Sequence, residues 1–146
     1  MVAQKPAIDG WFTTDAGDGE PHLLGSRCTT CGTFFFPRAD FFCRNPACDG
    51  TTFDEVPLSN RGRVWSWTVN RYQPPAPYVS PAGTNGAFEP FGIAAVELAE
   101  EKMVVLGQVV PGATVAVGDE VTLVVDTLFT DDDGTEQLVW KWSPVK

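Results

Sequence analysis

The stretch that decides the fold reads Cys28-Thr-Thr-Cys31 and, after eleven intervening residues, Cys43-Arg-Asn-Pro-Ala-Cys48. Four soft sulfur ligands in two short pairs are typical of a small domain built around one tetrahedral metal ion. Gly32 follows the first pair and permits the tight turn that presents both of its sulfurs. We therefore predict that Cys28, Cys31, Cys43 and Cys48 bind a structural metal, with zinc as first choice and iron as the alternative.

Two disulfide bonds, or redox-active cysteines, are the other chemistry that four cysteines allow. The first ten residues lack the basic segment and apolar run of an export signal, so we expect the protein in the cytoplasm. In such a reducing compartment this pattern more often binds metal. No apolar run approaches the roughly 20 residues of a membrane helix, so no membrane association is expected.

The net charge of the chain narrows the classes of molecule that it can be expected to bind. The 146 residues carry nineteen acidic and ten basic side chains, a net charge of −9. Nucleic-acid affinity depends mainly on basic side chains that neutralise phosphates, so the composition argues against nucleic acid as a partner. All six arginines lie between Arg27 and Arg71, and the second half is acidic. This asymmetry suits an anionic ligand or simply solubility.

The rest of the chain divides around the cysteines. Residues 1–23 are rich in turn-forming residues and predict an irregular arm that docks through Trp11 and Phe12. Residues 24–58 form the metal module, in which the many phenylalanines are expected to make a miniature core. Residues 59–146 are predicted to form a separate β domain.

Five segments of this last domain alternate apolar and polar residues, and a long loop over residues 70–89 follows the first of them. Five strands with short returns fit a small Greek-key barrel of the OB type, which closes its own sheet edges. In the first strand Trp65, Trp67 and Val69 fall on one face, and in the last Leu138, Trp140 and Trp142 do. The fold is thus predicted to be mainly β, a Cys₄ zinc ribbon followed by a five-stranded OB-fold barrel.

We find no residue set typical of catalysis. The only histidine, His22, lies in the turn-rich arm, and a metal held by four thiolates has no open position for water. The aromatic side chains around the long loop can be barrel core, or they can line an apolar groove or a partner-facing surface. Arg71 beside Tyr72 suits a phosphate or a carboxylate, because a guanidinium pairs with either in bidentate fashion. The candidate ligand or partner contacts are Trp65, Arg71, Tyr72 and Phe91.

Several stretches over roughly residues 24–144 are familiar in combination: Leu24–Gly32, Phe36–Arg38, Cys43–Cys48, Thr52–Leu58, Gly62–Thr68, Pro90–Leu98 and Val115–Val121. Together they resemble the DUF35 family of zinc-ribbon and OB-fold proteins associated with acyl-CoA metabolism. One departure is clear, since the second cysteine pair encloses four residues where the family usually has two.

The resemblance implies an accessory subunit without chemistry of its own, which docks on a thiolase-like acyl-CoA enzyme. Such partners include lipid-transfer-protein type thiolases and aldol lyases of steroid side-chain degradation. The family also implies that the ribbon and barrel help to bind or channel the CoA thioester at the shared interface. Two other functions stay open: a single-stranded nucleic-acid-binding protein, since OB barrels stack bases on aromatic faces, and a rubredoxin-like electron carrier.

Overall fold

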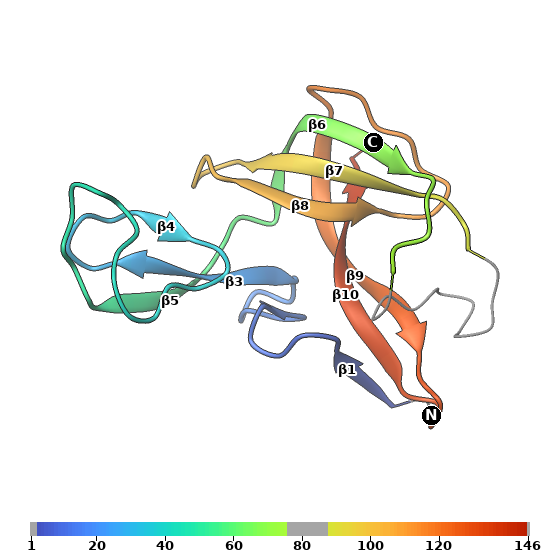
Figure 1. Cartoon of the computed structure of the whole chain (residues 1–146), viewed down its shortest axis with the longest axis horizontal. Helices are drawn as coiled ribbons and strands as arrows, with labels where there is room; N and C mark the ends of the chain where they lie inside the picture. The colour runs from blue at the N-terminus through green and yellow to red at the C-terminus, as the bar shows by residue number, and fades with distance from the viewer. Residues whose placement is uncertain (1–2, 76–87, 146) are drawn as a thin grey trace.

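The computed structural model describes residues 3–75 and 88–145, and every regular element in these ranges is a β-strand (Figure 1). Five of the strands form the barrel, in the order β8-β7-β6-β9-β10, and β10 pairs again with β8 to close it. The predicted five-stranded OB barrel is therefore confirmed. Its strands are β6 (Arg61–Asn70), β7 (Phe91–Leu98), β8 (Val104–Val109), β9 (Glu120–Thr130) and β10 (Glu136–Pro144).

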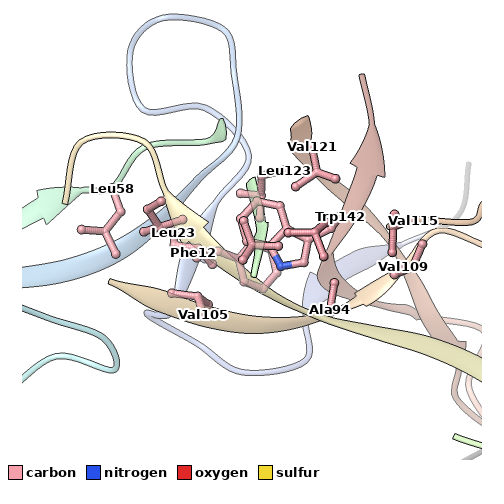
Figure 2. Close-up of a cluster of buried hydrophobic side chains, with 13 residues drawn as sticks. Phe12, Leu23, Leu58, Ala94, Val105, Val109, Val115, Val121, Leu123 and Trp142 are labelled. Carbon is pink, nitrogen blue, oxygen red and sulfur yellow. The ribbon is translucent and has the colours of Figure 1, made fainter. Parts of the chain in front are cut away.

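Alternate residues of the barrel strands point inward and make its core. Val121 and Leu123 of β9 are buried, and Leu123 lies opposite the fully buried Trp142 of β10. The core continues beyond the barrel, because Leu23 and Leu58 belong to the same buried cluster. Figure 2 shows this continuous row of side chains, with Trp142 near its middle. Barrel and ribbon thus share one hydrophobic core.

The ribbon is built on β3 (His22–Cys28), which pairs with β4 (Phe34–Phe35) and β5 (Phe53–Pro57), both antiparallel. At its first two residues, His22 and Leu23, β3 pairs antiparallel with the two-residue β2 (Phe12–Thr13). The predicted boundary after residue 58 falls in the short connection between β5 and β6. Leu58 is fixed there, because its backbone N–H donates to the carbonyl of Leu23 at 2.8 Å.

The N-terminal arm is more regular than predicted. Its strand β1 (Gln4–Pro6) runs parallel to β10 and pairs with Glu136–Leu138, whereas β8 pairs with β10 only at Lys141 and Trp142. β1 therefore provides hydrogen-bond partners for the part of the β10 edge that β8 does not reach, where backbone groups would otherwise be unpaired. Docking through the rings of Trp11 and Phe12 is seen, since Phe12 is buried in the core and Trp11 packs against it.

The predicted common face of Trp65, Trp67 and Val69 in the first barrel strand is wrong. A β-bulge between Val64 and Ser66 shifts the register of β6, so Trp65 does not share a face with Trp67 and Val69. The two tryptophans are not barrel core, since Trp65 is 64% and Trp67 47% exposed; Val64 is buried instead. Most of the predicted long loop, residues 76–87, lies outside the described residues. Among the described residues there is no helix that is long and apolar enough to cross a membrane.

Candidate functional site

The first cysteine pair lies in a tight turn at the end of β3. The N–H of Gly32 donates to the carbonyl of Cys28 at 2.9 Å, and the N–H of Cys28 donates to the carbonyl of Thr33 at 2.9 Å. Gly32 has a φ of +78°, a left-handed conformation that side chains rarely adopt. The turn directs the sulfurs of Cys28 and Cys31 to the same side.

The wider second pair closes into a turn of its own. Asn45 accepts two hydrogen bonds here, from the N–H of Ala47 to its side-chain Oδ1 and from the N–H of Cys48 to its carbonyl, both at 3.0 Å. Such a side-chain turn is the conformation that asparagine favours. The N–H of Cys43 donates to the carbonyl of Gly50 at 2.9 Å and fixes the start of the pair. Four intervening residues are therefore accommodated without displacing either sulfur.

The four sulfurs converge on one point. All lie within 4.8 Å of one another, with Cys28 Sγ 3.8 Å from Cys48 Sγ and Cys31 Sγ 3.6 Å from Cys43 Sγ. A tetrahedral ion with metal–sulfur bonds of about 2.3 Å requires sulfurs about 3.8 Å apart. All four cysteines are free thiols, so the disulfide alternative is not what this geometry forms. The donor set and its spacing fit zinc or iron.

The thiols differ in how readily they ionise. The hydroxyl and backbone of Thr33 hydrogen-bond to the sulfur of Cys31 and lower the pKa of Cys31 to about 6. Burial raises the pKa of Cys43 to about 12. A divalent cation would remove this difference in pKa between Cys31 and Cys43, because a coordinating thiol is deprotonated outright. A Cβ at Gly50 would lie 2.8 Å from Cys28 Sγ, so the backbone itself forms part of the wall around the sulfurs.

The ribbon phenylalanines divide into two groups. Phe34 and Phe36 pack on the core, and the rings of Phe35 and Phe53 contact each other edge to face at 6.3 Å. Phe41 and Phe42 do not join the expected miniature core. Their side chains are 83% and 68% exposed, between the buried Ala39 and Cys43.

A second candidate site is an apolar cleft at the barrel mouth, with a volume of about 210 Å³. It lies between β6, β7, the end of β8 and the turn that follows β8. Gly92 allows the strands to approach here, since a Cβ at this position would lie 3.2 Å from Val109. Trp67 and Arg71 border the cleft, together with Val69, Gly92, Val109 and Val115. We refer to it as the barrel-mouth cleft.

The four predicted contact residues do not form one group. Arg71 and Tyr72 follow the end of β6, and Phe91 pairs with Asn70 in the register of β6 and β7, so these three lie at one end of the barrel. Trp65 lies on the bulge, about 20 Å away along the strand. The sequence left open whether Trp67 is barrel core or lines a groove, and Gly92 in the β7 pattern was the available signal for a close backbone approach at the cleft.

His22 is occupied by structural contacts. Its Nδ1 lies 2.7 Å from the carbonyl of Leu58, and its Nε2 lies 2.8 Å from Oδ2 of Asp18. Asp131 likewise serves a turn, accepting the N–H groups of Asp133 and Thr135. The histidine and this acidic turn are thus both engaged in local contacts.

Two protein-family models match adjacent parts of the chain. Residues 15–54 match the family model of the ChsH2 rubredoxin-like zinc ribbon domain, and residues 55–126 match that of the ChsH2 C-terminal OB-fold domain. A DUF35 domain-containing scaffold protein of Methanocaldococcus jannaschii is 33% identical over 133 residues, covering 85% of this chain and 82% of the relative.

Two further similar proteins belong to enzyme assemblies. The benzoylsuccinyl-CoA thiolase subunit BbsA of Thauera aromatica is 28% identical over 125 residues, which cover 86% of this chain and 78% of BbsA. A solved structure described as Ltp2-ChsH2(DUF35) aldolase has a chain that superposes with a TM-score of 0.62 at 26% identity. The superposition covers 96% of this chain and 98% of that one.

Proposed function

Because this chain belongs to the DUF35 family, we propose that it is a non-catalytic accessory subunit of a thiolase-type or aldolase-type acyl-CoA enzyme. The observation that carries the proposal is the similarity, along nearly the whole of both chains, to a chain of the Ltp2-ChsH2(DUF35) aldolase. The similarity to a thiolase subunit supports it independently. Four cysteines that converge on one point and an apolar cleft suit such a subunit.

In this proposal Cys28, Cys31, Cys43 and Cys48 hold one structural zinc ion. Four thiolates leave no position for water or substrate, so the ion would supply folding free energy rather than Lewis-acid chemistry. Its effect would be to fix the ribbon turns relative to β3 and β5. One zinc per purified chain is the expected metal content. A red protein with one iron per chain would instead favour the electron carrier.

We assign contact with the CoA thioester to the barrel-mouth cleft. Its apolar lining suits the uncharged part of a thioester, and the exposed Arg71 at its edge suits a phosphate. Tyr72 and Phe91 lie at the same end of the barrel, and the exposed Trp65 is assigned to partner contact instead. Arg71→Ala is expected to raise the KM for the CoA thioester about tenfold with little change in kcat, as loss of uniform binding does.

We extend the proposal to the substrate of the complex and to its compartment. The family resemblance leads us to propose the CoA thioester of a steroid side chain, and thus a role in lipid metabolism. Faster turnover of an aromatic succinyl-CoA thioester than of a steroid thioester, measured on the purified complex, would overturn this choice. We also propose a cytoplasmic location, because a four-cysteine metal site is typical of a reducing compartment.

The test of the accessory role is co-purification from the native host. The tagged chain is expected to elute with a thiolase-like subunit in near-equal amount, and the activity of that subunit is expected to depend on the chain. The isolated chain should show no turnover. Elution of an active chain without any enzyme subunit would overturn the proposal.

A further inference from the structure

The segment Asp40-Phe41-Phe42, which we call the ribbon tip, exposes two adjacent aromatic side chains on a restrained loop. Phe41 and Phe42 are 83% and 68% exposed, the two highest values among the phenylalanines of the described chain. Aromatic side chains gain much by burial, so a pair left in water at one point of a small domain marks a surface that meets something else.

Both ends of the tip are fixed. On one side Ala39 is buried, its N–H donates to Ser26 Oγ at 2.9 Å, and its carbonyl accepts from the same hydroxyl at 3.3 Å. On the other side Cys43 is buried in the sulfur cluster, and its N–H donates to Gly50 at 2.9 Å. Only three residues lie between these anchors. The rings are therefore presented in a restricted geometry, which lowers the entropy lost on binding.

The area of the tip indicates the kind of occupant. Two phenylalanines exposed to this degree offer about 300 Å². A stable interface needs about 800 Å² from each partner, so pairing of two tips is too small to hold two copies of this chain together. The same area is ample for the central anchor of a larger interface, where a few buried aromatic residues carry most of the affinity.

The tip carries the exposed carboxylate of Asp40 and is followed closely by one exposed cation, Arg44. Residues 24–58 hold three arginines against four carboxylates, whereas the rest of the chain holds fifteen carboxylates against seven basic residues. Arg38 pairs with Glu55. Arg44, two residues beyond the tip, is exposed and lies over the ring of Phe35, and no ion pair engages it within the described residues. A carboxylate on the partner would complement it.

We propose that the ribbon tip is the anchor by which this chain docks on its enzyme partner. Phe41 and Phe42 enter an apolar recess of the thiolase-like subunit, and Arg44 pairs with a carboxylate at the rim of that recess. The inference rests on the proposed function and adds to it the contact surface. The barrel-mouth cleft and the ribbon tip then serve separate purposes, ligand contact and attachment.

The test measures the Kd between the purified chain and the purified thiolase-like subunit that co-elutes with it. Replacing both rings, in Phe41→Ser/Phe42→Ser, is expected to weaken binding at least 100-fold with unchanged metal content and Tm. Arg44→Glu is expected to weaken binding about tenfold. The matched control is Val117→Ser, which removes another exposed apolar side chain, in the turn before β9, and should leave the Kd unchanged.

A second variant separates contact from folding. Phe41→Leu/Phe42→Leu keeps apolar side chains and should bind within about fivefold of the wild type. If the serine variant binds within threefold of the wild type, the tip is not the anchor, and the accessory role stands. If the wild-type chain does not bind the subunit at all, the proposed function fails, and the inference fails with it.

Discussion

His22 shows at the scale of a single residue how one side chain links three segments of the chain. Its two ring nitrogens contact the carbonyl of Leu58 and the carboxylate of Asp18. Partial burial of the imidazole opposes protonation, but these two acceptors outweigh it and raise the pKa of His22 above its usual value. The hydrogen bond from His22 in turn lowers the pKa of Asp18.

The stability of the folded protein is therefore expected to depend on pH. A histidine whose pKa is raised by folding contributes stability below its unfolded pKa of about 6.5 and loses it as the pH rises through the folded value. We expect His22→Asn, which keeps a donor toward Leu58 but carries no charge, to lower the Tm at pH 6. The difference from the wild type should shrink between pH 6 and pH 8, as followed by thermal melts. A difference that grows over this range would contradict the assignment.

Gly107 of β8 is a second residue whose importance is visible only in the fold. A Cβ at this position would lie 2.7 Å from Nε1 of Trp142 and 2.9 Å from Nε1 of Trp140. The indole N–H of Trp142 is buried without a hydrogen-bond partner within the described structure. Both rings therefore pack directly on the glycine backbone.

Gly107→Ala is expected to destabilise the protein by about 2 to 3 kcal/mol, because two rigid rings must shift. Trp142→Phe removes the atom nearest to the new methyl group and also the unsatisfied donor. The double variant Gly107→Ala/Trp142→Phe should therefore lose less than the two single variants added together. Denaturant unfolding of the four proteins measures this, and simple additivity would show that the contact is not the cause.

At the scale of the element, the cysteine spacing and the alternation of β7 to β10 are local patterns, and both predicted the ribbon and the barrel correctly. The features that were missed depend on non-local geometry. The bulge that separates Trp65 from Trp67 is set by the pairing of β6 with β7, and β1 exists because β10 has an edge that β8 does not cover. The exposure of Phe41 and Phe42 depends on the fixed positions of Ala39 and Cys43, which no periodicity encodes.

At the same scale, we expect the stability of the ribbon to depend on the metal that its four cysteines would bind. Cys28→Ser removes one of four ligands and should abolish stoichiometric metal binding. We expect the ribbon to lose about 5 kcal/mol or more, since a structural metal site contributes directly to folding. Amide exchange should become fast in β3 to β5 and stay slow in β6 to β9. Wild-type protein treated with a chelator is the control and should behave alike; an unchanged Tm after loss of metal would contradict the prediction.

At the scale of the whole molecule, Trp140 joins the arm, the ribbon and the barrel. Its ring stacks on Trp11 at 6.1 Å and meets the edges of Phe12 at 6.1 Å and Phe36 at 5.7 Å. Its Nε1 donates to the carbonyl of Leu106 at 3.2 Å. One side chain of the last strand thereby contacts residues of the arm, the ribbon and the barrel.

Trp140→Ala is expected to cost about 3 kcal/mol, because it removes three ring contacts and leaves a cavity where the three segments meet. The matched control is Trp65→Ala, since Trp65 is 64% exposed and its loss should change the free energy of unfolding by about 0.5 kcal/mol or less. Equal costs for the two substitutions, measured by denaturant unfolding, would show that the aromatic cluster does not join the parts.

Trp140→Ala should also weaken binding to the enzyme subunit under conditions in which the variant stays folded. A partner that contacts both the ribbon tip and the barrel requires these two surfaces in a fixed relation, and this relation depends on Trp140.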